Sequence, residues 1–399
     1  MSFKNVWKIC LILIIGIGIS SCSDDEEQQI SVKLLATPAI EDAYDGAKAT
    51  GMEVVFTNMR DMNAVKGTLN ADGTAEVMLY KGVYNISIES KTTNTSDVEV
   101  IYTAKLENCA INTDGQQVKV DLHIFPANTN NESFIFSELF FNGEVNGVMM
   151  HPDQYMVIFN PTQEDLYADG LCFATAYQYS VLEKEAYFDE YMNNNKIPIS
   201  GFFTIPGSGK EHLVKAGDKI VIAFTAINHP KENGYENAVD LSGADFEVYD
   251  GPESSDVDVP EVPNVILTET LLYHPRGFFS NMLFKLENGN QNTIEAFFKA
   301  NTKEFTFPDG SKEMITSVDA DKIVDGVVTG DRPIVTRNLP ESVDRGFILV
   351  SGCHRNELVI RKEIKVGSQI FYEDTNNSEN DFVIKIGQTP YPKGWRTGK

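Results

Sequence analysis

The sequence is poor in several residue types, and its composition excludes some classes of protein and of partner. Its 399 residues include five cysteines, two tryptophans and six histidines, and 33 Lys and Arg stand against 58 Asp and Glu. The formal net charge of −25 disfavours nucleic acid as a partner, because its phosphates carry the same sign of charge. A hydrophobic content of 42% with 23% charged residues is typical of a globular chain, long enough for two or three domains.

The longest apolar run is too short to cross a membrane. It covers residues 9–19 and follows the positive side chains of Lys4 and Lys8. A helix of that length rises about 16 Å, whereas the bilayer core is about 30 Å thick. We therefore expect residues 1–21 to be a signal peptide that is removed.

A cysteine follows the apolar run at the position where lipoproteins are modified. The sequence Ile19-Ser20-Ser21-Cys22 resembles the lipobox of bacterial lipoproteins. This resemblance implies that Cys22 receives a diacylglycerol and becomes the acylated first residue. The alternative is an ordinary secretory signal followed by a chance cysteine.

Acidic residues come directly after Cys22. Ser23, Asp24, Asp25, Glu26 and Glu27 resemble the surface-export signal of Bacteroidetes lipoproteins. The resemblance implies an outer-membrane protein that is anchored by lipid and faces the extracellular side. The same acids also fit a solvated spacer, so we predict an acidic tether over residues 22–30.

Three cysteines remain beyond the lipobox, and they are widely spaced. Cys109, Cys172 and Cys353 form no C-x-x-C pattern of the kind that binds metal. Cys172 lies between Leu171 and Phe173, which predicts a buried thiol. One disulfide among the three stays open in an oxidising compartment.

Residues 31–126 show short alternating segments separated by turn residues. Gly73, Gly82 and Gly115 stand where tight turns need a positive φ angle. The pattern predicts an antiparallel β-sandwich of about seven strands. Residues 70–77 and 80–86, with Asp72-Gly73 and Gly82-Val83-Tyr84, resemble the prealbumin-like, carboxypeptidase-regulatory-like module. That family implies an accessory domain without catalytic residues, in which the tyrosine ring packs back over the core.

A polar linker over residues 126–133 leads to a second β-rich region. Its segments 134–143, 153–162 and 164–173, with the strand at 215–223, resemble the lamin-tail-like, immunoglobulin-type sandwich. Gln154 replaces an acid usual in that family. We expect one lobe over 134–250 and a second over 262–399, separated by an acidic, proline-bearing loop.

Two later segments extend the resemblance. They are residues 237–249 and the sequence around Asp374-Thr375-Asn376-Asn377-Ser378, which follows Arg361-Lys362. Residues 134–399 together resemble a Bacteroidetes lipoprotein family of unknown function, whose members look like partners of TonB-dependent transporters. The sequence predicts an all-β chain of tandem antiparallel sandwiches, with one or two short helices at 181–193 and 311–315.

Motifs for nucleotide or zinc chemistry do not fit the sequence. The segment 207–211, Gly-Ser-Gly-Lys-Glu, lacks both the first glycine and the Ser or Thr of a phosphate-binding loop. No histidine pair has the spacing of helical zinc ligands. We predict no cofactor and keep calcium open, because the oxygen-bearing residues Asp374, Asn376, Ser378 and Asn380 alternate along one loop and could surround that ion. An Asx-rich turn is the alternative.

Aromatic residues supply a diffuse binding signal. Tyr177, Tyr179, Tyr187 and Tyr191 gather within one insertion, where rings could stack on a sugar or a protein partner. Packing of these rings into the core is the alternative.

These observations predict a non-catalytic binding or accessory subunit on the cell surface, associated with a TonB-dependent barrel for capture of a nutrient or glycan. The alternative is a carbohydrate-active or other hydrolytic surface protein whose site is built from loops.

Overall fold

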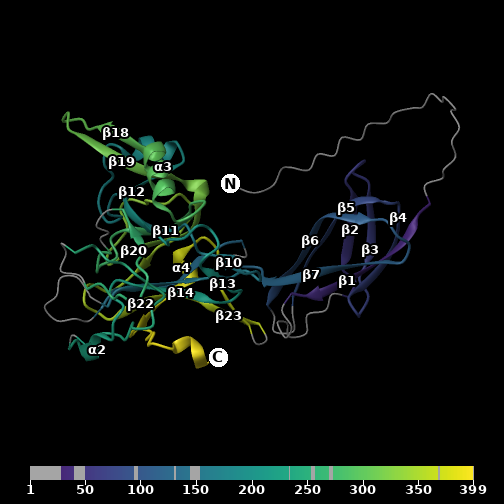
Figure 1. Ribbon diagram of the computed structural model, residues 1–399. Coiled ribbons are helices and arrows are strands. Elements are labelled where there is room, and N and C mark those ends of the chain that lie inside the picture. The colour runs from purple at the N-terminus through teal and green to yellow at the C-terminus, as the bar shows by residue number, and fades with distance from the viewer. Residues whose placement is uncertain are drawn as a thin grey trace.

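The computed structural model describes residues 28–39, 50–93, 98–129, 132–143, 153–232, 234–252, 257–268, 273–366 and 369–398. Within these residues the regular secondary structure is mainly β-strand, which confirms the predicted all-β class. A first module is joined to a larger body (Figure 1). The predicted lipidation and export residues 22–27 lie outside the described part of the chain.

The first module contains the strands of residues 30–126. They are β1 (Ile30–Pro38), β2 (Glu53–Asn58), β3 (Ala64–Thr68), β4 (Thr74–Leu79), β5 (Gly82–Thr93), β6 (Glu99–Ile111) and β7 (Gln116–Pro126). In the described residues their order is β3-β2-β5-β6-β7-β1-β4. Neighbours pair antiparallel except β1 and β7, which run parallel from Val32 beside Gln116 to Pro38 beside Leu122. Alternate side chains of each strand fill one core, as their period of two requires.

The turn before β4 shows why its sequence contains Asp72-Gly73. The carboxylate of Asp72 accepts hydrogen bonds from the backbone N–H (3.1 Å) and hydroxyl (2.7 Å) of Thr74. Gly73 has φ +75°, and a Cβ atom there would lie 2.5 Å from the carbonyl oxygen of Ala36. Glycine is therefore required by both the turn and the adjacent strand.

Tyr84 behaves as the resemblance implied. Its ring is 2% exposed within the core of the module, and its hydroxyl donates a 2.9 Å hydrogen bond to the carbonyl of Tyr80. This hydrogen bond connects the β4–β5 turn to Tyr84 near the start of β5.

The body consists mainly of two sheets. In the described residues the first has the order β15-β14-β9-β8-β22-β25. Its strands are β8 (Ile135–Asn142), β9 (Tyr155–Phe159), β14 (Lys219–Ala223), β15 (Phe246–Glu247), β22 (Glu357–Arg361) and β25 (Phe382–Ile386).

In the described residues the second sheet has the order β18-β19-β12-β11-β17-β20-β21, and β16 lies beside β12. Its strands are β11 (Leu171–Ala176), β12 (Lys196–Thr204), β16 (Ile266–Leu267), β17 (Ser280–Lys285), β18 (Thr302–Thr306), β19 (Lys312–Asp319), β20 (Ile323–Gly330) and β21 (Ile348–Leu349). Two short pairs are β10 (Leu166–Tyr167) with β13 (Leu213–Val214), and β23 (Glu363–Val366) with β24 (Gln369–Tyr372).

The body does not divide into the expected lobes 134–250 and 262–399. Each large sheet contains strands from both ranges, because β8 pairs with β22 and β11 pairs with β17. The loop that we expected to separate two lobes thus connects β15 to β16 within one folded body.

Both large sheets are covered on both faces. Phe136 and Leu139 of the first sheet meet Phe173 and Leu283 of the second in the central core. The outer face of the second sheet carries another apolar cluster that includes Ile294, and the outer face of the first carries a third. Burial on both faces explains why every residue of β8 is buried and why its sequence does not alternate.

The helices differ from the sequence prediction. They are α1 (Phe188–Asn193), α2 (His229–Glu232), α3 (Gln291–Asn301) and α4 (Ser378–Asp381), with 3₁₀ turns η1 (Ala320–Lys322) and η2 (Trp395–Gly398). The helix predicted over 181–193 is present only in its last residues. The predicted helix 311–315 is wrong, because the turn at Asp309-Gly310 directs the following residues back along β18 as β19.

Candidate functional site

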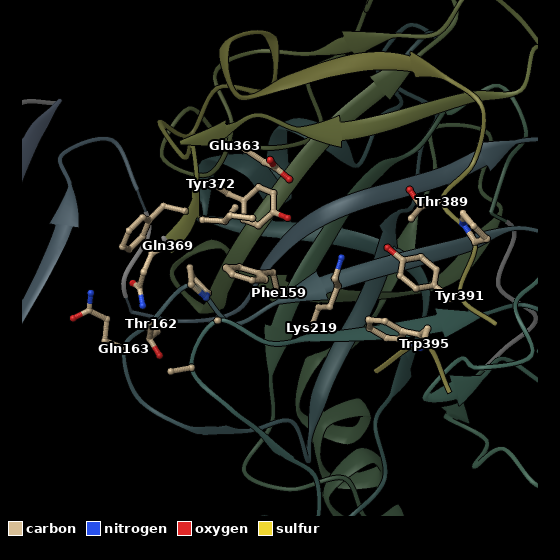
Figure 2. Close-up of a pocket in the computed structure, with 16 residues that line it drawn as sticks. Phe159, Thr162, Gln163, Lys219, Glu363, Gln369, Tyr372, Thr389, Tyr391 and Trp395 are labelled. Carbon is tan, nitrogen blue, oxygen red and sulfur yellow. The ribbon is translucent and has the colours of Figure 1, made fainter. Parts of the chain in front are cut away.

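A cleft lies where the first sheet of the body approaches the first module. It has a volume of about 780 Å³. Figure 2 shows its side chains, which come from the end of β9, the turns at 161–163 and 216–219, the β23–β24 hairpin and residues 389–395. We call it the aromatic cleft, after Phe159, Phe371, Tyr372, Tyr391 and Trp395 in its lining.

The turn after β9 is fixed by Asn160. Its amide nitrogen donates to the carbonyl oxygens of Glu164 (2.8 Å) and Val214 (3.0 Å). Its amide oxygen accepts from the backbone N–H (3.0 Å) and hydroxyl (2.7 Å) of Thr162. Because one side chain satisfies several backbone groups, the sequence after Phe159 forms a rigid edge of the cleft.

The carboxyl-terminal segment forms another wall. Tyr391 and Trp395 pack edge to face with their ring centroids 5.0 Å apart. The indole N–H of Trp395 donates a 2.8 Å hydrogen bond to the carbonyl of Gly243, and the Gly243 N–H donates to the carbonyl of Tyr391 at 2.8 Å. A Cβ atom on Gly243 would lie 2.3 Å from the carbonyl oxygen of Pro392. Glycine at this position therefore permits the close approach of the segment.

Lys219 brings a positive charge to these rings. Its ammonium lies 5.4 Å from the centroid of Tyr391 and 5.9 Å from that of Trp395. Figure 2 shows it between Phe159 on one side and Tyr391 on the other. Both distances fall within the range of cation–π attraction.

The β23–β24 hairpin closes the cleft toward the first module. Tyr372 packs edge to face on Phe159, with centroids 4.7 Å apart. Phe371 instead packs against Phe125 at the end of β7, at 6.4 Å. Successive residues of β24 thus serve different contacts, as the alternation of a strand dictates.

Two buried tyrosine hydroxyls bind one carboxylate beneath the cleft. Its hydroxyl donates to one carboxylate oxygen of Glu138 (2.8 Å), and the hydroxyl of Tyr155 donates to the other (3.2 Å). Burial, and then the nearby charge of Glu138, raise the pKa of both tyrosines above its usual value. Both phenols therefore stay protonated and act as hydrogen-bond donors.

The chemistry of the aromatic cleft suits binding of a polar molecule with apolar faces. Its described lining combines aromatic rings with the amides of Gln163 and Gln369, the hydroxyls of Thr162 and Thr389, and one carboxylate from Glu363. Phe159, Phe371, Tyr372 and Tyr391 are buried and form the walls, so the partly exposed Trp395 supplies the ring surface for contact. The amides and hydroxyls would orient a ligand. A volume of this size is in the range of small-molecule sites.

The sequence singled out other aromatic residues. Tyr187 and Tyr191 are 1% and 6% exposed and pack in a small core with Ile315, so the expectation of exposed binding rings is wrong for these two. Tyr177 is half-buried against Tyr187 at 5.4 Å, and Tyr179 is half-buried against Phe279 at 4.7 Å. The structure thus favours the alternative, core packing.

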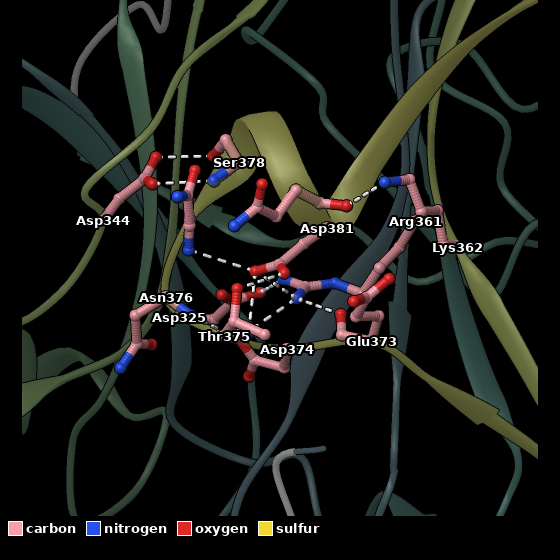
Figure 3. A network of polar contacts seen from close by, with 12 residues as sticks. Asp325, Asp344, Arg361, Lys362, Glu373, Asp374, Thr375, Asn376, Ser378 and Asp381 are labelled. Carbon is pink, nitrogen blue, oxygen red and sulfur yellow. Dashed lines mark hydrogen bonds and ion pairs between the residues drawn. The ribbon is translucent and has the colours of Figure 1, made fainter. Parts of the chain in front are cut away.

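The residues considered for calcium take part in a polar network that is buried around Asp374 and Ser378, whereas Asn376 and Asn380 are exposed (Figure 3). Asp374 lies 3.2 Å from the guanidinium of Arg361. Ser378 donates through its hydroxyl and its backbone N–H to Asp344. The carbonyl of Asn380 accepts from Lys362, while the backbone N–H of Asn376 donates to Asp374. These contacts favour the Asx-rich turn, and calcium stays a prediction from the sequence.

Arg361 lies at the centre of this network. Its Nε donates to the carbonyl of Phe136 (2.6 Å), and its terminal nitrogens donate to Asp325 (2.7 Å) and the carbonyl of Glu373 (3.0 Å). Burial raises the pKa of Asp325 to about 7, although the charge of Arg361 opposes this effect. The network joins β8, β20 and β22 to the loop that precedes α4.

The glycine-rich segment at 207–211 surrounds a carboxylate of the protein itself. Asp169 accepts hydrogen bonds from the backbone N–H groups of Gly209 (3.2 Å), Glu211 (2.9 Å) and His212 (2.8 Å). Burial acts to raise the pKa of Asp169, but these donors outweigh it and lower the pKa. The segment is therefore a structural turn, with an aspartate where a phosphate would sit.

The cysteines and the other potential metal ligands form no metal site in the described residues. Cys109, Cys172 and Cys353 are free thiols, and Cys172 is buried, as predicted. Across the described residues, no group of three or more His, Cys, Asp or Glu side chains is arranged to hold a metal ion. In that same part of the chain, no helix has the length and apolarity to cross a membrane.

Sequence reasoning missed the residues of the aromatic cleft. Lys219, Tyr372 and Tyr391 lie far apart in the chain and line one cleft only because β14, β24 and the segment after β25 converge. The segment Thr389-Pro390-Tyr391-Pro392-Lys393-Gly394-Trp395 carried a signal, because closely spaced prolines indicate an extended segment outside helices and central strands.

Comparisons with known proteins place these observations in a family context. Residues 215–389 match the profile of a family described as "Protein of unknown function (DUF4876)". No curated protein matches the chain. The family match supports the coarse expectation of an uncharacterised Bacteroidetes family over those residues.

Solved structures support the fold. A crystal structure of a DUF4876 family protein from Bacteroides thetaiotaomicron VPI-5482 is 19% identical, with a TM-score of 0.57, over 92% of this chain and 97% of that chain. A DUF3823 family protein from Parabacteroides merdae ATCC 43184 is 12% identical over 39% of this chain and 69% of that chain, with a TM-score of 0.16. At these identities the first likeness concerns the fold alone, and the second carries no argument.

Proposed function

We propose that this chain is a surface-exposed outer-membrane lipoprotein that captures a ligand in the aromatic cleft as a non-catalytic accessory subunit. The observation that supports this proposal most directly is the lining of the cleft. It combines the partly exposed indole of Trp395 with amide, hydroxyl and ammonium groups. We further propose that the subunit works with a TonB-dependent barrel, that the first module is carboxypeptidase-regulatory-like, and that the body is lamin-tail-like.

Trp395 is an intrinsic fluorescent probe in the lining of the cleft. The chain has two tryptophans, Trp7 and Trp395, and Trp7 lies in the proposed signal peptide. Intrinsic tryptophan emission of the mature protein would therefore report on the cleft. We expect soluble oligosaccharides that bind there to change this emission in a saturable way, because a ring stacked on the indole replaces water.

Calorimetric titration with the same oligosaccharides measures the affinity. Loss of one stacking ring in Trp395→Ala should weaken binding about tenfold, which corresponds to about 1.4 kcal/mol. Met314→Ala is the matched control, because Met314 is 62% exposed and lies on β19, away from the cleft. Equal affinities of the wild type and Trp395→Ala would contradict a binding role for the cleft.

The anchor and the barrel partner are tested separately. Cys22→Ala should release the chain from membranes and abolish incorporation of labelled palmitate, because Cys22 is the proposed site of acylation. Purification from detergent-solubilised outer membrane should also recover a barrel protein. Recovery of the chain alone would argue against the accessory-subunit part of the proposal.

A further inference from the structure

One end of the first module carries the start of the described chain together with two turns. β1 begins at Ile30, which pairs with Leu79 at the end of β4. The β4–β5 turn with Tyr80 therefore lies beside the point where the chain arrives from residues 22–27. β7 runs parallel to β1 and ends at Pro126, next to the body, so this end of the module points away from the body (Figure 1).

Large apolar side chains are exposed at this end. They are Met59 (41%), Met62 (67%), Tyr80 (44%) and Val83 (41%), and we call them the apolar pole. Exposed large apolar groups that gather on one surface indicate contact with another apolar phase or partner.

Backbone contacts hold the apolar pole together. The N–H of Met59 donates to the carbonyl of Val83 (2.8 Å), and the hydroxyl of Tyr84 donates to the carbonyl of Tyr80 (2.9 Å). The N–H of Met62 donates to the carbonyl of Asn58 at 2.9 Å. The two turns thus present their side chains as one surface, with the exposed Lys81 next to Tyr80.

The distance from the proposed anchor limits where this surface can lie. A chain extends by at most about 3.6 Å per residue, so Gln28 lies within about 20 Å of Cys22. This step rests on the proposed function, in which Cys22 is acylated. An acyl anchor in the outer leaflet would then hold the apolar pole near the lipid headgroups.

From this arrangement we propose that the apolar pole rests on the lipid leaflet and inserts Met62 and Tyr80 into its interfacial region. Tyrosine suits this region, because its ring is apolar and its hydroxyl is polar. Lys81 complements lipid phosphates at the same depth. The pole is thus a second membrane contact beside the lipid, and it directs the body and the aromatic cleft away from the membrane.

Tryptophan emission tests this contact in the full-length acylated protein. In a Trp395→Phe background, Tyr80→Trp and Met314→Trp each place one tryptophan in the mature chain, at the pole or on the distant β19. The proteins are reconstituted in phosphatidylethanolamine–phosphatidylglycerol liposomes with or without brominated acyl chains. We expect brominated lipid to quench and blue-shift the tryptophan at position 80 and to leave that at position 314 unchanged.

Flotation of the liposomes separates the possible failures. Protein that does not float lacks the anchor, which refutes the lipoprotein proposal itself. Protein that floats while tryptophan at position 80 stays unquenched overturns the membrane contact alone. An emission shift seen only in native outer membrane would assign the apolar pole to a protein partner. A shift in lipid-free solution that depends on protein concentration would assign the pole to a second copy of the chain. Either result overturns the proposal.

Discussion

Arg361 shows how a single residue can organise several elements. Its guanidinium is buried and stacks on Phe382 at 4.4 Å while it contacts Asp325 and Asp374. Asp381, 3.9 Å from the same guanidinium, in turn accepts from Thr375 and Asn377. A buried charge of this kind is tolerated because every neighbour is hydrogen-bonded.

Removal of this cation should strongly destabilise the body. Arg361→Met leaves buried carboxylates without their counter-charge, and such a loss costs about 3–5 kcal/mol of unfolding free energy. Urea unfolding followed by circular dichroism measures the change. Arg345→Met is the matched control, because the exposed Arg345 contacts the same loop through the carbonyl of Thr375. Similar unfolding midpoints for the two variants would contradict the central role of Arg361.

Asp153 gives a prediction about pH. It is buried and accepts a 3.2 Å hydrogen bond from Gln388, and burial raises its pKa to about 6. In the unfolded chain its pKa is about 4, so between these values the folded state holds a proton that the unfolded state has lost. Stability should therefore fall by about 2 kcal/mol as the pH rises from about 4 to about 6.

The isosteric variant Asp153→Asn should lose this part of the pH dependence, because the amide does not titrate. Thermal unfolding of both proteins at a series of pH values measures the effect. The explanation fails if the stability profiles of the two proteins stay parallel across this interval.

At the scale of elements, burial on both faces decides which sequences form which strands. β8 carries apolar residues on both faces, because one face meets the central core and the other meets the cluster around Phe140 and Tyr155. Helix α3 covers the outer face of the second sheet through Ile294. Its Phe298 stacks on Phe202, and Phe297 packs edge to face on the same ring.

The start of α3 depends on its cap. The side-chain oxygen of Asn290 accepts a 3.0 Å hydrogen bond from the N–H of Thr293. Asn290→Ala should lower the free energy of unfolding by about 1 kcal/mol, whereas Asn290→Asp should keep the cap. Thermal unfolding of the pair measures the difference. Equal losses in both variants would mean that the cap does not support the helix.

Local signals made part of these elements predictable. The turn at Asp72-Gly73 and the buried thiol of Cys172 follow from neighbouring residues, and both predictions are confirmed. Helix α3 was missed, since its apolar residues 294, 297 and 298 span little more than one turn. The aromatic cleft could not be predicted, because its walls come from residues more than 200 positions apart that no local pattern connects.

At the scale of the whole molecule, a compact joint connects the first module to the body. The side-chain amide of Gln163 donates to the carbonyl of Ile124 (2.6 Å) and accepts from its N–H (3.2 Å), as a neighbouring strand would. The N–H of Asp374 donates to the carbonyl of Asn128 (2.7 Å), and Phe125 packs with Phe371 and Val366. The cleft shares Gln163 and Phe371 with this joint.

Weakening the joint should free the module to reorient. In the double variant Gln163→Ala, Phe371→Ala, both the amide pair and the ring contact are lost, so small-angle scattering should show a larger radius of gyration than the wild type. Gln369→Ala is the control, because Gln369 lies on the same hairpin and lines the cleft. An unchanged scattering profile of the double variant would show that the remaining contacts suffice.

The parallel pairing of β1 and β7 has a mechanical consequence. A pull applied at Ile30 and opposed at Pro126 acts along both strands in opposite directions, because the load enters at the beginning of one strand and leaves at the end of its neighbour. The ladder of hydrogen bonds between them then lies across the line of force, and its bonds must break together rather than one after another. The module is thus built to bear tension in shear between its two ends.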